Sequence, residues 1–201
     1  MFTPALYRDR NNFRLVTMAG VRNAQCSDDT VSGHFKVKLI ELAGTQDVRL
    51  IETFVNCPDD AGSIVKFTRQ FGPLKTPAIE GGKFSFTIED FKQSQAYFRD
   101  LWKQPKALGQ LGIPDGTLRL SRGTITYEAT DLFRYLQFDL LMNEADRVRV
   151  CKRVGCPHPY FVAAHLNKRF CSQDCAEEGQ RDAKRDWWQR NGQEWRQTQK
   201  G

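Results

Sequence analysis

The stretch CKRVGCPHPYFVAAHLNKRFCSQDC, residues 151–175, holds four of the six cysteines of this 201-residue chain. These four follow the pattern C-x4-C-x14-C-x3-C, in which two close pairs are separated by an insert of hairpin length. Such pairs are typical of a tetrahedral thiolate site, because each pair can hold the ion from one turn while the insert closes the loop. We therefore predict one zinc ion per chain, bound by Cys151, Cys156, Cys171 and Cys175.

The residues around these cysteines predict a small finger. Residues 157–170 are expected to form a strand, a turn and a returning strand, with Phe161 and Phe170 closing a miniature core. The Ser172 side chain is a suitable acceptor for a helix N-terminus, and a helix is predicted over 176–197. The second cysteine pair would lie at the start of that helix, where the helix dipole favours thiolates. Together these parts predict a treble-clef-like finger.

Other interpretations of the cysteines are open. The four could form a pair of disulfides or be unrelated buried thiols, and His158 or His165 could act as alternative ligands. The first 16 residues contain no uninterrupted apolar segment of the kind found in secretory signals. We therefore expect a cytoplasmic, reducing location, in which clustered thiols bind metal. Cys26 and Cys57 are isolated in the chain and are expected to be ordinary buried or partly buried thiols.

The basic charge of the chain lies in its last quarter. Residues 148–201 contain 11 Lys and Arg against 6 Asp and Glu, whereas residues 1–147 contain 19 against 18. This asymmetry is expected of a module that faces nucleic acid. The predicted domains are therefore 1–147 and 148–201, and no flexible linker joins them because an alternating segment runs directly into Cys151.

The basic residues of this region have two explanations. Four thiolates around a divalent ion leave a charge of about −2, so nearby cations are expected for that reason alone. The same cations could instead bind nucleic-acid phosphates, which makes DNA the predicted partner. The candidates beside the cysteines are Arg149, Lys152, Arg153, Lys168 and Arg169, and those on the C-terminal helix are Arg181, Lys184 and Arg185.

Tryptophans continue the stripe of cations along the predicted helix. Trp188 and Trp195 share the helical spacing of the basic residues, and Trp187 lies beside them. Aromatic rings next to cations are typical of a helix that binds nucleic acid. The alternative, which we favour for Trp187 and Trp188, is that the indoles dock the helix on its own protein.

Residues 1–147 predict an α+β domain, which could act as a sensor or regulatory domain. The predicted strands are 13–16, 35–42, 48–55, 118–120 and 124–127. The predicted helices lie between Asp60 and Gly72, between Thr87 and Pro105, and over 129–144. In the last of these helices, apolar residues surround most of the segment 131–142. The helix should therefore be buried in its own domain or shared with a second copy of the chain, so a homodimer is one hypothesis.

Two classes of protein are disfavoured. No apolar run approaches the roughly 18 residues of a membrane span. Treble-clef scaffolds can carry His-Asn-His nuclease sites, but here no histidine follows His165. A zinc ion held by four cysteines has no open position for a reactive water, and neither a phosphate-binding glycine loop nor a nucleophile elbow is present. We therefore expect no enzymatic activity.

The C-terminal segment resembles the CGNR zinc finger of bacterial proteins described as stress-induced transcription regulators, in which the finger follows an N-terminal α+β domain. The matching features are the first cysteine pair, an aromatic-containing hairpin, the approach Arg169-Phe170-Cys171-Ser172 and a basic helix after Cys175. The Gly-Asn-Arg of that family is replaced by Ala176-Glu177-Glu178, and the second pair is one residue closer, so the role of that tripeptide does not carry over.

The resemblance implies zinc bound by four cysteines and a DNA-directed regulatory role. The alternative function is a zinc-stabilised protein–protein interaction module that does not bind nucleic acid.

Overall fold

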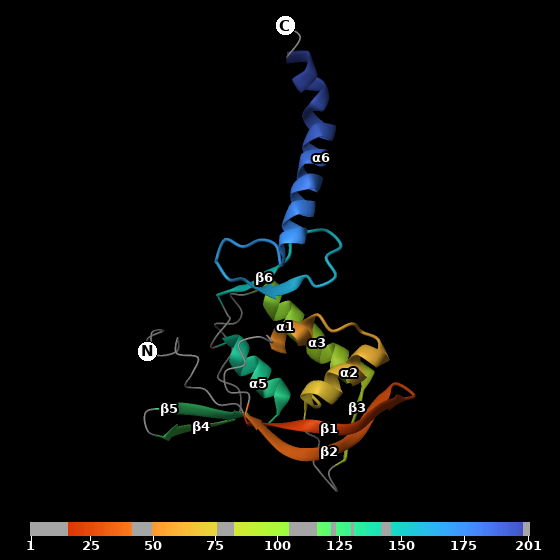
Figure 1. The fold of residues 1–201 in the computed structure, drawn as a ribbon, viewed down its shortest axis with the longest axis vertical. Coiled ribbons are helices and arrows are strands. Elements are labelled where there is room, and N and C mark those ends of the chain that lie inside the picture. Colours follow the sequence, from red (N-terminus) through yellow and green to blue (C-terminus); the bar gives the residue numbers. More distant parts are fainter. Residues whose placement is uncertain are drawn as a thin grey trace. The chain divides into compact units, whose positions relative to one another are not determined.

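A computed structural model describes residues 16–41, 50–75, 83–104, 116–121, 124–129, 131–141 and 146–198 of the chain (Figure 1). The fold is of the predicted α+β class. The chain divides into two compact units, Met1–Asp146 and Arg147–Gly201, a division that lies one residue before the predicted one. Among the described residues, no helix is both long enough and apolar enough to span a bilayer.

A three-stranded antiparallel sheet forms the base of the first unit. Its strands β1 (Val16–Ser27), β2 (Thr30–Glu41) and β3 (Lys83–Thr87) lie in the order β1-β2-β3. Asp28 and Asp29 join β1 to β2 with positive φ angles of 47° and 61°, as the mirror-image turns of tight hairpins require. Of the predicted strand 35–42, residues 35–41 fall in β2, and of the predicted strand 13–16, Val16 falls in β1; residues 13–15 and 42 lie outside the described part. The rest of β1 and all of β3 were not predicted.

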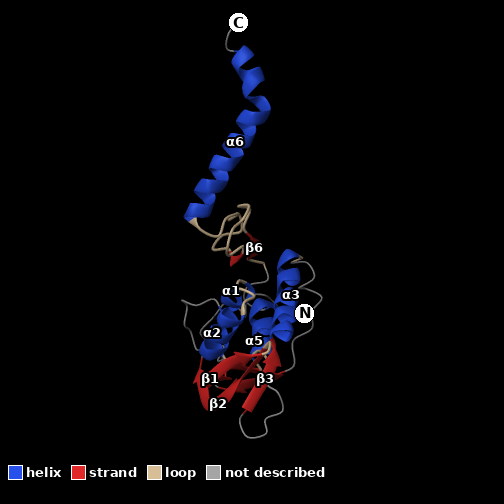
Figure 2. Ribbon diagram, turned by 90° about the vertical axis from the view of Figure 1, so that its right-hand side faces the viewer, coloured by secondary structure: helices blue, strands red, loops and turns tan. Residues whose placement is uncertain are grey.

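The helices of the first unit gather on one side of this sheet (Figures 1 and 2). They are α1 (Leu50–Val55), α2 (Ala61–Phe71), α3 (Ile88–Lys103) and α5 (Leu132–Asp139). Phe54 of α1 lies at the centre of the core, with ring centroids 5.2 Å from Phe91 and 5.5 Å from Phe98. Such edge-on aromatic contacts add to the apolar area that the rings remove from water.

Helix caps confirm two of the predicted helix starts. Asp60 accepts a 2.9 Å hydrogen bond from the Ser63 amide at the start of α2. Thr87 and Asp90 form a reciprocal capping box at the start of α3, with bonds of 3.0 and 3.1 Å. Hydrogen bonds from the Ser63 side chain and amide lower the pKa of Asp60, and those from the Thr87 hydroxyl and amide lower the pKa of Asp90.

The predicted strand over 48–55 is wrong, because residues 50–55 form α1. Leu50, Ile51, Phe54 and Val55 are buried, and this spacing of one, three and four residues is helical. The short segment LIETFV also alternates in part, so its period was ambiguous. The buried Gln95 amide donates to the carbonyls of Phe54 and Cys57, at 2.7 and 2.9 Å, and so satisfies the end of this short helix.

The predicted hairpin is confirmed, and so is the presence of the last helix of the first unit, although it starts later than the predicted 129–144 because Ala129 ends the second strand of the hairpin; residues 142–144 lie outside the described part. Strands β4 (Gly116–Ser121) and β5 (Thr124–Ala129) pair antiparallel, and α5 begins after Asp131, whose carboxylate accepts from the Arg134 amide at 2.8 Å. The residues Leu132, Leu136 and Phe138 are buried within the single chain. This burial accounts for the apolar character of the helix; the homodimer remains a prediction.

The second unit contains two short strands and a long helix. They are β6 (Val148–Val150), β7 (Tyr160–Val162) and α6 (Gln173–Thr198). The predicted hairpin within 157–170 is wrong, because β7 pairs with β6 and residues 168–170 form no strand. The register opposes the buried Val148 to the buried Val162, whereas residues 164–169 are all exposed, Leu166 among them, and bury no apolar face.

Candidate metal centre

Four cysteine sulfurs converge in the second unit. Cys151 follows β6, Cys156 follows the next turn, Cys171 precedes α6 by two residues and Cys175 lies in its first turn. Their Sγ atoms all lie within 4.8 Å of one another. Three of the separations are 3.5 Å (156 to 171), 3.7 Å (156 to 175) and 3.4 Å (171 to 175).

These separations fit a tetrahedral metal site. Metal–sulfur bonds of about 2.3 Å in a tetrahedron place sulfurs about 3.8 Å apart, whereas a disulfide requires about 2.05 Å. None of the six cysteines forms a disulfide. Within the described residues the cluster consists of the four predicted cysteines, without His158 or His165. The predicted ligand set is therefore brought together, although the sulfurs alone do not identify the ion.

Local sequence explains how the sulfurs are positioned. Gly155 has a φ of 72°, a left-handed conformation that lets the chain turn between the first two cysteines. The Ser172 hydroxyl accepts from the Cys175 amide at 3.2 Å and so caps α6, as predicted. The Cys151 amide donates to the Pro159 carbonyl at 2.7 Å, which ties the first ligand to the approach of β7.

A small apolar cluster supports the cysteines. Phe161 and Ala163 are buried against the sulfurs, and the partly buried Phe170 packs on the same cluster, which confirms the predicted miniature core. The ring of Phe170 lies on Gly179 of α6, where a Cβ would come within 2.5 Å of a ring carbon. Gly179 was not predicted as important; a glycine inside a helix, where it is unfavourable, was the available signal.

Arg153 connects the site to α6. Its Nη1 lies 3.7 Å from the Cys175 sulfur, and its guanidinium also forms an ion pair with Glu178. Hydrogen bonds from Ser172 and Arg153 lower the pKa of the Cys175 thiol to about 6. The Cys175 sulfur in turn raises the pKa of Arg153. Arg153 thus balances thiolate charge, one of the two roles predicted for the basic residues here.

The other sulfurs hold their protons more tightly. Burial raises the pKa of Cys156, and it raises that of Cys171 further because neighbouring sulfurs also disfavour a second thiolate. A divalent ion would reverse this preference, since it replaces the protons as the partner of the thiolates. Outside the cluster, Cys57 is an ordinary buried thiol whose pKa is raised to about 11, chiefly by burial, and Cys26 is partly buried.

The basic candidates fall into two groups. Near the sulfurs, Arg149 donates to the carbonyls of Val148 and Leu166 at 2.8 and 3.1 Å, while Lys152, Lys168 and Arg169 are exposed. The Lys152 amide donates to the Arg169 carbonyl at 3.1 Å, so their backbones are adjacent.

On α6, each arginine of the predicted set pairs with an acid of the same helix. The separations are 3.6 Å for Arg181 and Glu177 and 3.3 Å for Arg185 and Asp182, and Lys184 is exposed. Five basic and no acidic residues occur in 149–169, whereas residues 170–201 contain six of each. The basic excess therefore belongs to the residues around the sulfurs, and the prediction that α6 shares it is wrong.

The three tryptophans of α6 are two-fifths exposed, at 43% for Trp187, 40% for Trp188 and 44% for Trp195. Their rings pack edge-on against one another, with centroids 5.0 Å apart for 187 and 188 and 5.1 Å apart for 188 and 195. The favoured prediction that Trp187 and Trp188 dock α6 on the protein stays a prediction. The indoles form an exposed aromatic cluster.

Comparison with protein-family models, with curated proteins and with solved structures found no match.

Proposed function

We propose that residues 147–201 are a zinc-stabilised module of the CGNR type that binds nucleic acid, within a DNA-binding transcriptional regulator. The observation that carries this proposal is the convergence of four cysteine sulfurs within 4.8 Å of one another. The regulatory role and the preference for DNA rest on the resemblance of the cysteine segment to that family.

Zinc is the ion that best suits the cluster. A site of four thiolates with tetrahedral spacing favours zinc or iron, and a closed set of protein ligands is typical of a structural zinc ion. Elemental analysis of the purified, reduced protein is expected to give one zinc per chain. An absorption band in the visible range together with iron would contradict the assignment, and a protein without stoichiometric metal would remove the proposal.

The residues around the sulfurs offer the surface best suited to phosphate. Lys152, Lys168 and Arg169 are exposed in a segment without acidic residues. Because the α6 arginines already pair with acids of their own helix, they have less to gain from a phosphate. We therefore assign the main phosphate contacts to the three exposed cations.

A pair of matched triple variants tests this assignment. In K152Q/K168Q/R169Q we expect duplex DNA to bind at least about tenfold more weakly, and the slope of log K against log salt to fall by about three. The variant R181Q/K184Q/R185Q removes the same number of charges and should have a smaller effect. Fluorescence anisotropy at several salt concentrations measures both. Equal losses of DNA affinity in the two variants would mean that α6 contributes to the interface as much as the cysteine loop does. Salt-independent binding would contradict phosphate contacts altogether.

The aromatic cluster favours a second candidate function, a protein–protein interaction module. Exposed indoles clustered on one helix are typical of partner surfaces, in which tryptophans often dominate the binding energy. Under this alternative, W188A should abolish partner binding while K152Q/K168Q/R169Q leaves it intact. The opposite pattern supports nucleic-acid binding.

A further inference from the structure

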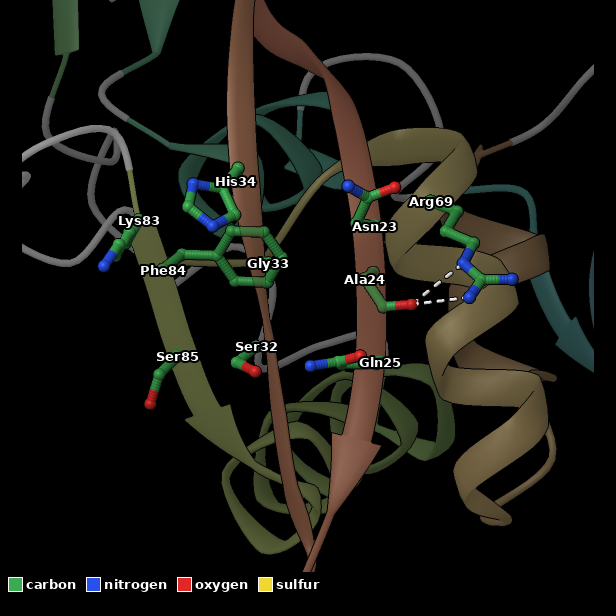
Figure 3. Close-up of a pocket in the computed structure, with 10 residues that line it drawn as sticks. All are labelled: Asn23, Ala24, Gln25, Ser32, Gly33, His34, Arg69, Lys83, Phe84 and Ser85. Atoms are coloured by element: carbon green, nitrogen blue, oxygen red, sulfur yellow. Dashed lines mark hydrogen bonds between the residues drawn. The ribbon is translucent and has the colours of Figure 1, made fainter.

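A polar depression lies on the three-stranded sheet of the first unit. Residues of β1, β2 and β3 line it, together with Arg69 of α2 (Figure 3). Its volume of about 900 Å³ is within the range of about 300–1,000 Å³ that is usual for small-molecule sites. It is distinct from the cysteine cluster, which belongs to the second unit.

The strand register sets polar side chains opposite one another in the depression. His34 on β2 is paired with Lys83 on β3, and Ser32 is paired both with Ser85 on β3 and with Gln25 on β1. Residues two apart on a strand share a face, so these side chains form two adjoining polar rows. Figure 3 shows the Gln25 and Ser32 side chains directed toward one another.

Two contacts fix the strands that carry the depression. Gly33 and Phe84 alternate with the polar residues and so face the opposite side of the sheet, where the buried Phe84 ring lies against Gly33 and a Cβ would come within 2.8 Å of ring carbons. Beside β1, Arg69 donates from Nε and Nη2 to the Ala24 carbonyl, at 3.0 and 2.6 Å, which fixes its guanidinium (Figure 3).

The charge of the lining favours an anion. It contains lysine, arginine and histidine but no aspartate or glutamate. Within the described part of the chain, neither His34 nor Lys83 has an acidic partner. The Lys83 ammonium and a ring N–H of His34 are both hydrogen-bond donors, and an anion that accepts from both would form charge-assisted bonds.

We propose that this depression binds a small molecule that carries an oxyanion, either a phosphate or a carboxylate. Lys83 and His34 hold the oxyanion, and the hydroxyl and amide groups of Ser32, Ser85 and Gln25 bind the polar remainder of the molecule. The first unit is then the ligand-binding part of the protein, independent of what the second unit binds.

NMR titration of the full-length, metal-loaded protein tests the proposal. Inorganic phosphate and succinate are added separately, with sodium chloride at equal ionic strength as the reference. We expect saturable amide shifts confined to 23–34, 69 and 83–85. A response to phosphate alone identifies a phosphate ligand, and a response to succinate alone or to both identifies carboxylate recognition. Shifts that sodium chloride reproduces overturn the proposal.

Variants link the response to the named side chains. K83Q should weaken binding of the anion at least about tenfold, the size of a lost hydrogen bond to a charged group. H34Q is a second variant, expected to weaken binding less, and K66Q, an exposed lysine of α2 outside the depression, is the control. Unchanged affinity in both K83Q and H34Q contradicts the site. Because the affected amides belong to the first unit, this failure is distinguishable from failure to bind zinc or DNA.

Discussion

Residues 1–146 and residues 147–201 are held together by different interactions. The first unit has a core of aromatic rings, in which Phe54, Phe91 and Phe98 are almost completely buried. Among its described residues the second unit buries few apolar side chains besides cysteines, namely Val148, Phe161, Val162 and Ala163. Burial of apolar surface can stabilise the first unit, whereas the second has too little such surface and requires another source of free energy. The comparison therefore predicts which changes each unit tolerates.

Metal removal should have the largest effect, confined to the second unit. Chelation, or C175S, is expected to unfold residues 147–198, because structural zinc contributes about 10–16 kcal/mol in comparable small fingers. NMR spectra before and after chelation measure this, with amides of the first unit as an internal reference. C26S, which changes a cysteine outside the cluster, should leave the metal content unchanged. If the second unit stays folded without metal, the claim that the two units are stabilised by different interactions is contradicted.

Truncation of the aromatic core should have the converse effect. Phe98 is fully buried and packs edge-on against Phe54, so F98A should destabilise the first unit by about 3–5 kcal/mol. Denaturant unfolding followed by NMR measures the loss for each unit. The zinc content should not change, and coupled loss of zinc would show that the two units fold as one.

A smaller effect is expected at the contact between α6 and the cysteine loop. G179A places a methyl group within 2.5 Å of the Phe170 ring, so we expect a loss of about 1–3 kcal/mol from overpacking. In G192A the nearest atom, at 3.0 Å, belongs to the exposed Trp188 ring, which can move. There the better helix propensity of alanine should stabilise α6 by about 0.5–1 kcal/mol. Effects of the same sign in thermal unfolding would argue against the Phe170 contact.

The smallest effect concerns the helix caps of the first unit. T87A should cost about 1 kcal/mol, because the Asp90 amide loses its acceptor. The folded-state pKa of Asp90 lies below its unfolded value of about 3.9, so the cap stabilises the fold above that pH and this stabilisation is lost as the pH falls through the folded value. Urea unfolding between pH 7 and pH 2 measures this dependence, and it should weaken in T87A. An unchanged pH profile would contradict the capping box.

Local signals made the capped helices and the ligand set predictable. The Asp60 and Thr87 caps depend on residues three positions apart, and the cysteine spacing encodes two turns, so both can be read without tertiary information. The helix α1 and the partner of β7 depend instead on long-range packing. Leu50–Val55 is too short for its apolar spacing to distinguish a helix from a strand. Val148 and Val162 lie on either side of the first cysteine pair, so their pairing is not evident from neighbouring residues.

The charge of the second unit was misassigned for a related reason. A count over 148–201 treats the unit as uniform, whereas the structure separates the cysteine loop from a helix whose arginines pair with its own acids. The positions of Glu177 and Asp182, four residues before and three residues before their arginines, carried this signal in the sequence. The polar depression on the sheet could not have been found, because it combines residues of three strands and a helix.

The segregation of basic residues in the cysteine loop has a consequence for how the protein behaves during purification. A loaded site offsets the five cations of 149–169 by a charge of about −2, and stripping the ion lets thiols regain protons and reduces that offset to about −1, because the Cys175 thiol has a pKa of about 6. The emptied loop is then more cationic than the loaded one and will retain polyanions, such as contaminating nucleic acid or a heparin column, more strongly. Stronger retention on such a matrix thus indicates that the ion has been lost. Preference for one DNA sequence over another is what indicates a correctly assembled finger.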